Sequence, residues 1–460
     1  MMGRRVMAEP LFYTFRLEDH VPADHAWRVV DALLDTAFVR RVMAPHYSAI
    51  GRPSIDPELM IRMLLVGYLS GIRSERRLCA EVHLNLAHRW FCRLGLDGAV
   101  PDHSTFSKNR HSRLRDGGVF RAVFEAVVRR CAEAGLVPGE GAAVDGGQVE
   151  ADASRHRRLP GNTVPEAWTA DREAQSRPVR EYLDALDAAA PPEPDEPRHE
   201  APKYLSPTDP AAAWSNKHGV GVFAYETNLL VDTAHGIIVD VGATPARLSQ
   251  EIVAAKAMLA RAAMVLGFAP PRLAADKSCG TGPFLTWLLA RGVAPHIPVL
   301  DRTHQREGMF TRASFAYEEA EDAWRCPAGH RLRRAGLERS TGMQRYSARE
   351  ADCRVCALKS RCTRGKARSL GISIHEPARE AAQALAGTDA YKDSQRRRKK
   401  VEVLIAHLKQ QLGIRRLRLR GLQGAAEEFH LAAAAQNLRR LARLIARMAA
   451  ARQARAAAPA

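Results

Sequence analysis

The spacing of apolar and polar positions changes near residue 140 of this chain. Between residues 24 and 136 the apolar positions recur at helical spacing. Asp56, followed by a proline, is placed to cap one of these helices, and either Asp102 or Ser104 can cap another. A plain helical bundle with solvated charges and a DNA-contacting helical module fit this pattern about equally well. The pattern therefore predicts an all-helical region over residues 1–138.

Strand-like and helical runs alternate after residue 140. A short buried strand is predicted to end at Asp145, and the proline- and acid-rich stretch 155–215 predicts a mobile insertion rather than a core element. Two strand-like runs follow, and then a helix, a strand that leads to Asp276, a second helix and a final strand. This order predicts a mixed α/β fold with the first strand central and the fourth beside it. Asp145 and Asp276 would then be neighbours.

Helical periodicity resumes near residue 394 and continues almost to the end of the chain. Arg398, Glu402 and Lys409 lie on one narrow stripe of this helix, because they are four and seven residues apart. The stripe borders an apolar arc, and an acid there can point into a cleft while its helix stays packed. The arc consists of Val401, Leu404, Ile405, Leu408 and Leu412.

The charge balance concerns the partners of the protein rather than its fold. Lys and Arg number 69 against 51 Asp and Glu, which gives a net charge of +18. This excess favours a polyanion such as nucleic acid as partner, although a generally arginine-rich proteome would also produce it. With 46% hydrophobic residues the chain is not a disordered one. We find no apolar core of signal-peptide length at the start and no stretch near the roughly 18 apolar residues of a membrane span, so we expect a cytoplasmic protein without membrane contact.

Convergent carboxylates are the chemistry that DNA cleavage and joining require. Such reactions use two magnesium ions about 3.5–4 Å apart, held by hard oxygen ligands. Taken singly, an Asp at a strand end is more often a turn or cap residue, and a Glu beside a cation on a helix is usually part of a surface pair. Position alone does not exclude three other acids at strand-like ends, Asp232, Asp240 and Asp301.

Several segments resemble, in order, the DDE transposases of bacterial insertion sequences, in the RNase H-like superfamily. The segments are PDHSTFSKNRH, AVDGGQVEADAS, GVFAYETNLLVD, IIVDVGATPA, LAADKSCGTGPFLTWLLARG and RRRKKVEVLIAHLKQQLG with the RGL and NLRRL elements after it. Arg398, Glu402 and Lys409 match the family signature of Arg, three residues, Glu, six residues and Lys. Gln395 and Cys279 stand where the family often has aromatic residues, so we expect altered DNA contacts rather than loss of chemistry.

The resemblance implies that Asp145, Asp276 and Glu402 hold two Mg²⁺ or Mn²⁺ ions. It implies cleavage of phosphodiesters at the ends of an insertion sequence and joining of the 3′-OH ends to target DNA. The partner would be double-stranded DNA, both terminal inverted repeats and target, with a homodimer on the paired ends. An RNase H-like nuclease that does not join DNA and a decayed, DNA-binding repressor remain alternatives.

Basic residues near the matched motifs are the expected DNA contacts, because phosphates bind Arg and Lys side chains. Arg398 and Lys409 flank the Glu on its helix, and Lys108 and Arg110 belong to the basic N-terminal segment. Arg420 begins the RGL element. The basic C-terminal helix could lie along phosphates, but packing on the core with arginines in water is an equally simple interpretation.

Four of the eight cysteines cluster between residues 326 and 362. Eight cysteines are few for a chain of 460 residues, which argues against a disulfide scaffold and for a reducing compartment. The C-x2-C pair is typical of a zinc knuckle, and four thiolates make a closed structural site. We expect Zn²⁺ on Cys326, Cys353, Cys356 and Cys362, with His330 as a substitute ligand. The alternative is a loop with ordinary reduced thiols.

The predicted organisation joins an N-terminal helical domain to an RNase H-like mixed sheet with a cysteine-rich insert and a helical C-terminus. The expected boundaries are 1–138 for the helical DNA-binding domain, 139–305 for the first part of the catalytic core, 306–375 for the insert, 376–430 for the part of the core that carries the Glu helix, and 431–460 for a basic C-terminal helix.

Overall fold

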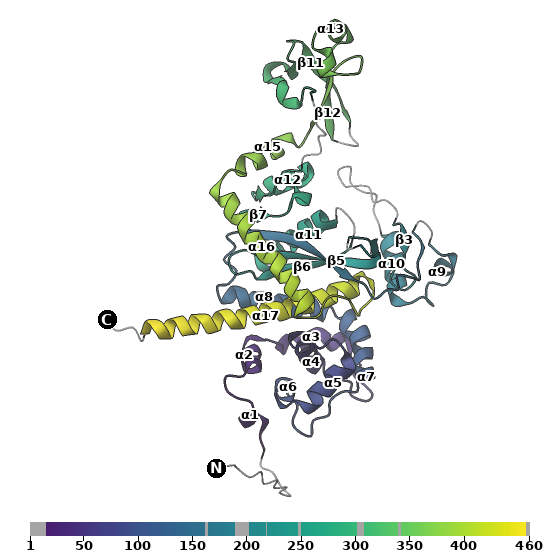
Figure 1. Cartoon of the computed structure of the whole chain (residues 1–460). Coiled ribbons are helices and arrows are strands. Elements are labelled where there is room, and N and C mark those ends of the chain that lie inside the picture. The colour runs from purple at the N-terminus through teal and green to yellow at the C-terminus, as the bar shows by residue number, and fades with distance from the viewer. Residues whose placement is uncertain are drawn as a thin grey trace. The chain divides into compact units, whose positions relative to one another are not determined.

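The computed structural model describes residues 15–161, 164–188, 202–217, 219–246, 250–300, 308–338 and 342–456 (Figure 1). The chain forms two compact units. Unit 1 comprises Met1–Pro138, Val149–Asp152 and Val403–Ala460, and unit 2 comprises Gly139–Gln148 and Ala153–Glu402. In the described parts of the chain no helix is both long enough and apolar enough to cross a membrane.

Unit 1 is helical, as predicted. Asp56 caps α4 by accepting a hydrogen bond from the backbone N–H of Glu58 at 2.9 Å, and Asp102 caps α7. The N-terminal helices are α1 (Leu17–His20), α2 (Ala26–Leu33), α3 (Ala37–Met43), α4 (Pro57–Leu69), α5 (Glu75–Leu84), α6 (Leu86–Phe91), α7 (His103–Asn109) and α8 (Val119–Glu133), with a π-helical turn η2 (Arg110–Leu114).

Helix α4 is the centre of this unit rather than an amphipathic helix at its surface. The sequence predicts one apolar face, but every residue from Met60 to Leu69 is buried. The physical reason is that α17 (Gly421–Ala456) packs against α2, α4 and α8, so helices cover α4 on several sides. Arg62 is among the buried residues, where its guanidinium pairs with Asp31 and Glu58.

Unit 2 contains the mixed sheet that the sequence predicts. Its strand order is β4-β5-β1-β7-β8, with β6 on β5. Strand β1 pairs in parallel with β7, and β7 with β8, whereas β4, β5 and β6 pair antiparallel. Strand β7, which leads to Asp276, thus lies beside the central strand β1, as predicted, and this is the RNase H-like arrangement. The bounds are β1 (Ala142–Glu150), β4 (Ala213–Ser215), β5 (Val222–Asp232), β6 (Ile238–Pro245), β7 (Arg272–Ala274) and β8 (Ala294–His296).

Helices α11 (Gln250–Leu266) and α12 (Gly282–Leu289) follow the strands in the predicted order. Helix α11 packs on β5 and β6, while α12 packs on β8 and on α15 (Glu376–Leu385). Helix α11 ends before Gly267, whose φ of +64° is a conformation that glycine adopts without strain. Helix α15 lies before residue 394, so the helical region resumes earlier than the sequence pattern predicts.

The sequence predicts that the first strand ends at Asp145, but β1 continues to Glu150. The two glycines after Asp145 suggest a turn, yet here they serve close packing. A Cβ atom on Gly146 would lie 3.1 Å from Cγ and Cδ of Glu226 on β5, so the glycine makes room for this neighbouring side chain. Beyond it the backbone N–H of Glu150 donates to the carbonyl of Arg415, which extends the pairing of the strand.

The stretch 155–215 is also more ordered than predicted wherever the structure describes it. Trp168, Val179, Leu183 and Leu205 form a small buried cluster of their own. The elements around it are β2 (Leu159–Pro160), α9 (Glu166–Ala170), α10 (Arg177–Asp187) and β3 (Tyr204–Leu205), and β4 extends the main sheet. The abundance of proline and acid hid these few apolar anchors, and residues 189–201 lie outside the described residues.

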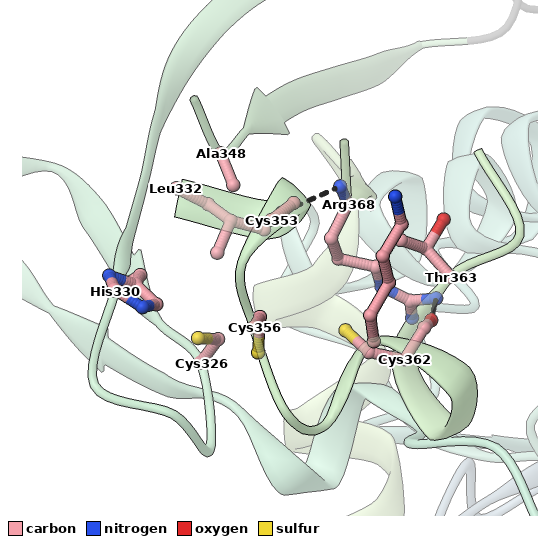
Figure 2. Close-up of a pocket in the computed structure, with 10 residues that line it drawn as sticks. Cys326, His330, Leu332, Ala348, Cys353, Cys356, Cys362, Thr363 and Arg368 are labelled. Atoms are coloured by element: carbon pink, nitrogen blue, oxygen red, sulfur yellow. Dashed lines mark hydrogen bonds between the residues drawn. The ribbon is translucent and has the colours of Figure 1, made fainter. Parts of the chain in front are cut away.

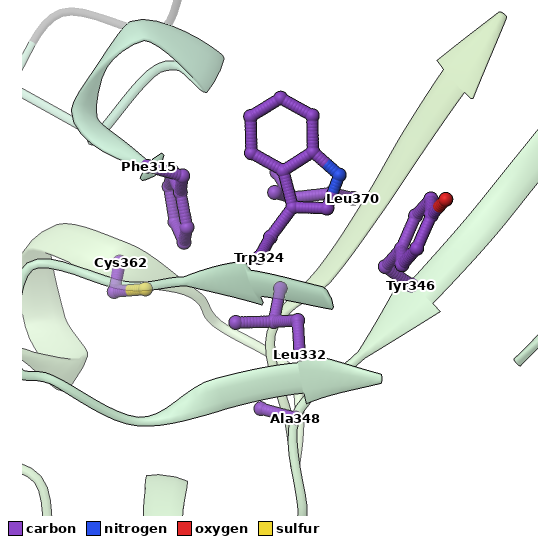
Figure 3. Close-up of a cluster of buried hydrophobic side chains, with 7 residues drawn as sticks. All are labelled: Phe315, Trp324, Leu332, Tyr346, Ala348, Cys362 and Leu370. Carbon is purple, nitrogen blue, oxygen red and sulfur yellow. The ribbon is translucent and has the colours of Figure 1, made fainter. Parts of the chain in front are cut away.

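The cysteine-rich insert folds as an antiparallel sheet of order β13-β12-β11-β10-β9. Side chains from its strands, from α14 and from the residue before β9 form a core that includes Phe315, Trp324, Leu332 and Cys362 (Figure 3). The elements are β9 (Ala316–Glu318), β10 (Ala323–Arg325), β11 (Arg331–Glu338), β12 (Met343–Ser347), α13 (Glu350–Arg354), α14 (Lys359–Cys362) and β13 (Ser369–Ser373).

The two last helices carry the predicted Glu and the C-terminal residues. Helix α16 (Asp389–Gln410) contains Glu402; the predicted apolar arc is buried, and its last member, Leu412, lies just beyond the end of the helix. Helix α17 runs without interruption through residue 431, where the sequence predicts a boundary. Leu438 and Leu441 are fully buried, so this part of the helix belongs to the core of unit 1.

Candidate active site and cysteine pocket

Parallel pairing of β1 with β7 brings Asp145 and Asp276 together. Ala143 is in register with Ala274; Asp145 follows two residues later on β1, and Asp276 follows two residues after the last residue of β7. Asp276 caps the short helical turn η3 (Lys277–Cys279) by accepting from the backbone N–H of Ser278 at 2.9 Å. Gly280 completes the turn, since a Cβ there would lie only 2.0 Å from the carbonyl oxygen of Pro298. The local sequence thus holds Asp276 at the end of β7.

Arg398 connects the two ends of the predicted triad. Its Nη1 lies 2.7 Å from Oδ2 of Asp145, and its Nη2 lies 3.0 Å from Oε1 of Glu402. One guanidinium therefore binds a carboxylate of the sheet and a carboxylate of α16 at once. The side chain of Glu402 remains 55% exposed, whereas those of Asp145 and Arg398 are mostly buried. The stripe read from the helix thus faces the strand that carries Asp145.

Two further acids lie at this site, and the sequence reasoning missed both. Glu251 stands in the first turn of α11, and Glu226 is a buried residue of β5. Oxygen atoms of Glu251 and Asp276 and the sulfur of Cys279 all lie within 4.8 Å of one another. Ser278 Oγ is 2.9 Å from Oε2 of Glu251 and 2.5 Å from Oδ1 of Asp276. An acid in a first helical turn is too common to have signalled this role.

These carboxylates affect one another electrostatically. Burial raises the pKa of Asp145, and the negative charges of Asp276 and Glu251 add to this rise, while Arg398 opposes it. Burial and the charge of Glu251 likewise raise the pKa of Glu226. Shared negative charge in a partly dry site is the environment in which a bound cation is most stabilising.

The structure separates these acids from the other strand-end candidates. Asp232 accepts hydrogen bonds from the backbone N–H groups of Gly139, Ala234 and His235, which makes it a turn residue. Asp240 pairs with Arg261 at 3.0 Å. Both are fully buried in structural roles, and Asp301 lies outside the described residues.

Helix α16 is anchored to the sheet next to Asp276 by polar residues that the sequence reasoning did not assign. The Gln395 amide donates to the backbone carbonyls of Ala275 and His296, and the His296 ring lies 2.7 Å from Ser394 Oγ. Gln395 replaces the aromatic residue common in the resembled family. Here it fixes the distance between the helix and the ends of β7 and β8.

The cations predicted to contact DNA differ in accessibility. Arg110 is only 3% exposed, and its guanidinium donates to Glu75 at 2.9 Å, so it offers little surface to DNA. Arg110 lies on the buried side of η2, whereas Lys108 on the preceding helix, α7, is exposed. Arg420 is exposed and pairs with Asp152 at 2.9 Å, and Lys409 is half-buried.

The cysteine-rich insert brings its four cysteines to one pocket (Figure 2). Cys326 follows β10 in a tight turn, in which its N–H donates to the carbonyl of His330 and the N–H of Gly329 donates back to Cys326. Cys353 Sγ accepts a bond from the backbone N–H of Arg368 at 3.5 Å. Among the described residues no three of these thiol sulfurs lie mutually within 4.8 Å. Its lining includes Cys326, His330, Cys353, Cys356 and Cys362.

Comparison with known proteins places the chain. A family model described as a transposase domain (DUF772) matches residues 15–112, and one described as a transposase DDE domain matches residues 325–442. Both matches support the DDE transposase that the sequence resemblance predicts. The second match contains the cysteine pocket, Arg398 and Glu402, whereas Asp145 and Asp276 lie between the two matches.

More distant comparisons add little detail. A piggyBac transposase, whose cryo-EM structure is a synaptic complex with hairpin DNA, is 9% identical to this chain with a TM-score of 0.31. The alignment covers 90% of this chain and 73% of that one. No curated protein gives a significant match. The family assignment therefore rests on the two transposase domains.

Proposed function

We propose that this DNA transposase cleaves the ends of an insertion sequence and joins them to target DNA at Asp145, Asp276 and Glu402. The single observation that carries the proposal is the contact of Arg398 with Asp145 and Glu402, because it joins the sheet acids to the acid of α16. Carboxylate oxygens are the ligands that Mg²⁺ and Mn²⁺ prefer, so these acids suit two such ions. When bound, such ions activate an attacking oxygen and stabilise a leaving one.

The acids of the site would hold the metal ions, and Arg398 would help to orient the DNA. Asp145 and Asp276 approach the phosphodiester from adjacent strands, and Glu402 approaches from α16. Arg398 neutralises part of their charge, and on binding of metal its guanidinium is free to turn towards a DNA phosphate. Hydrolysis frees a 3′-hydroxyl, which then attacks target DNA in the same site, since both steps are in-line phosphoryl transfers.

DNA is proposed to be held by cations outside the acid cluster. The candidates are the exposed Lys108 and Arg420 and the half-buried Lys409, whereas Arg110 is buried and Arg398 acts within the site itself. Contacts of this kind position the duplex without reading its sequence. A homodimer follows from the need to hold two ends at once.

Paired transposon ends distinguish the proposed function from its alternatives. We expect the purified full-length chain, with Mg²⁺ and DNA bearing the inverted repeats that flank its gene, to produce both cleaved ends and ends joined to a target plasmid. Cleavage without joining would identify an RNase H-like nuclease. Binding of the repeats without either product would identify a repressor.

The cysteine pocket is proposed to hold one structural Zn²⁺ through Cys326, Cys353, Cys356 and Cys362. The insert is small, and domains of this size usually need a metal or disulfides in addition to their core. Its cysteines are free thiols, so no disulfide supplies this stabilisation. Cys362 belongs to both the core and the pocket lining, so closure of the pocket on a metal would also tighten the core (Figures 2 and 3).

Mass-spectrometric metal analysis tests this site. We expect about one zinc ion per chain in the wild-type protein and loss of that zinc in Cys356→Ser, because a tetrahedral site needs all four ligands. The matched control is Cys79→Ala, which removes a thiol of α5 and should keep the zinc. Equal zinc content in wild type and Cys356→Ser would contradict the proposal.

A further inference from the structure

Glu251 lies where the proposed metal ions would be held, although it belongs to none of the matched motifs. It stands in the first turn of α11, the helix that packs on β5 and β6. Its carboxylate shares Ser278 Oγ with Asp276, and the two carboxylates approach within 4.8 Å. The single hydroxyl proton of Ser278 can bond only one of them at a time, so it leaves the negative charge of the pair largely uncompensated.

Charge balance at the site requires further cations. The acids of this region are Asp145, Glu226, Glu251, Asp276 and Glu402, and among the described residues only two cations form ion pairs with them. Arg398 serves Asp145 and Glu402, and Lys217 lies 3.7 Å from Glu226. Asp276 and Glu251 thus have no cation of their own among these pairs. Like charges held this close favour a divalent ion between them.

The neighbouring thiol does not compete for this role. Cys279 is buried, and its sulfur is a soft donor, whereas carboxylate oxygens are the ligands that Mg²⁺ and Mn²⁺ prefer. The oxygens of Glu251 and Asp276 therefore define this part of the site as one for a hard cation such as Mg²⁺ or Mn²⁺.

We propose that Glu251 is a fourth carboxylate of the metal centre and binds, together with Asp276, one of the two divalent ions. This inference rests on the proposed function, which it deepens by adding a ligand from α11. A helix that packs on β5 and β6 then contributes directly to the centre, so the site draws on β1, the end of β7, α11 and α16.

Binding of Mn²⁺ to the full-length protein without DNA tests the proposal, followed by electron paramagnetic resonance of the free ion. We expect Glu251→Gln to weaken the tighter Mn²⁺ site at least about tenfold, because it replaces an anionic ligand by a neutral amide of the same shape. Glu251→Asp keeps the charge and should retain part of the affinity. Thiolates prefer zinc, so the cysteine pocket does not contribute to the Mn²⁺ signal.

Glu166→Gln is the matched control, since Glu166 is an exposed Glu in the first turn of α9. It should bind Mn²⁺ like the wild type. Unchanged Mn²⁺ binding in Glu251→Gln would overturn the proposal, as would a wild-type protein that binds no Mn²⁺. If Glu251→Gln weakens binding but the wild type neither cuts nor joins DNA, the metal ligand stands and the transposition proposal fails. If cleavage and Mn²⁺ binding both survive in Glu251→Gln, the transposition proposal stands and Glu251 is not a ligand.

Discussion

Asp145→Asn is expected to lower the rate of DNA end cleavage and strand transfer at least about 10³-fold. The substitution keeps the size of the side chain and removes its negative charge. Metal-assisted stabilisation of phosphoryl transfer contributes several kcal/mol, and each 1.36 kcal/mol corresponds to a factor of about ten in rate. Asp145 lies on the central strand of the sheet and pairs with Arg398. Quantification of cleaved and joined products on paired ends measures the effect.

The control for this variant is Asp184→Asn, which neutralises an exposed aspartate of α10 that pairs only with Arg172 among the described residues. Its activity should match that of the wild type. DNA binding by Asp145→Asn, measured in parallel, should persist, because the DNA contacts proposed outside the centre are untouched. If every DNA activity of Asp145→Asn equals that of the wild type, the proposed centre is wrong.

The largest expected effect on stability is that of Glu428→Gln in unit 1. Glu428 is fully buried on α17, where it accepts hydrogen bonds from the backbone N–H groups of Arg418 and Leu419, both at 2.6 Å, and pairs with Arg73. Breaking a buried ion pair by removing one charge costs about 3–5 kcal/mol, because the other charge stays buried without compensation. Hydrogen–deuterium exchange of α4 and α17 peptides should show faster opening by the corresponding factor.

Glu133→Gln provides the comparison, since Glu133 on α8 forms an exposed pair with Arg130 at 3.1 Å. Exposed pairs contribute little to stability, so exchange should barely change. Exchange in unit 2 should be similar in both variants. Equal protection of α17 in Glu428→Gln and in the wild type would mean that the buried pair does not hold the helix in unit 1.

Features that follow from the local periodicity of helices and strands were predictable from the sequence. Helical spacing placed Arg398 and Glu402 on one stripe of α16, and the structure has both on the face towards β1. The alternation of strands and helices predicted that β1 and β7 are neighbours, and the register of Ala143 with Ala274 agrees. Both inferences depend only on the geometry of regular elements and on short connections.

Other features depended on contacts between residues far apart in the chain. Arg110 reads as an exposed basic residue, yet it is buried because Glu75 on another helix binds it. The glycines after Asp145 read as a turn, but Gly146 instead accommodates Glu226 from β5. No periodicity reports such pairings, because each arises where two elements meet.

The amino-acid pattern was therefore sufficient for the order of the elements and for the mixed sheet, since these follow from spacing along the chain, whereas the three acids were singled out by the family resemblance. Glu251 and the Gln395 anchor of α16 emerged only when the helices were packed against the sheet. The same is true of the meeting of four cysteines at one pocket. The physical reason is that ligand sets and ion pairs depend on distances in space, and folding brings together residues whose separation in sequence carries no such information.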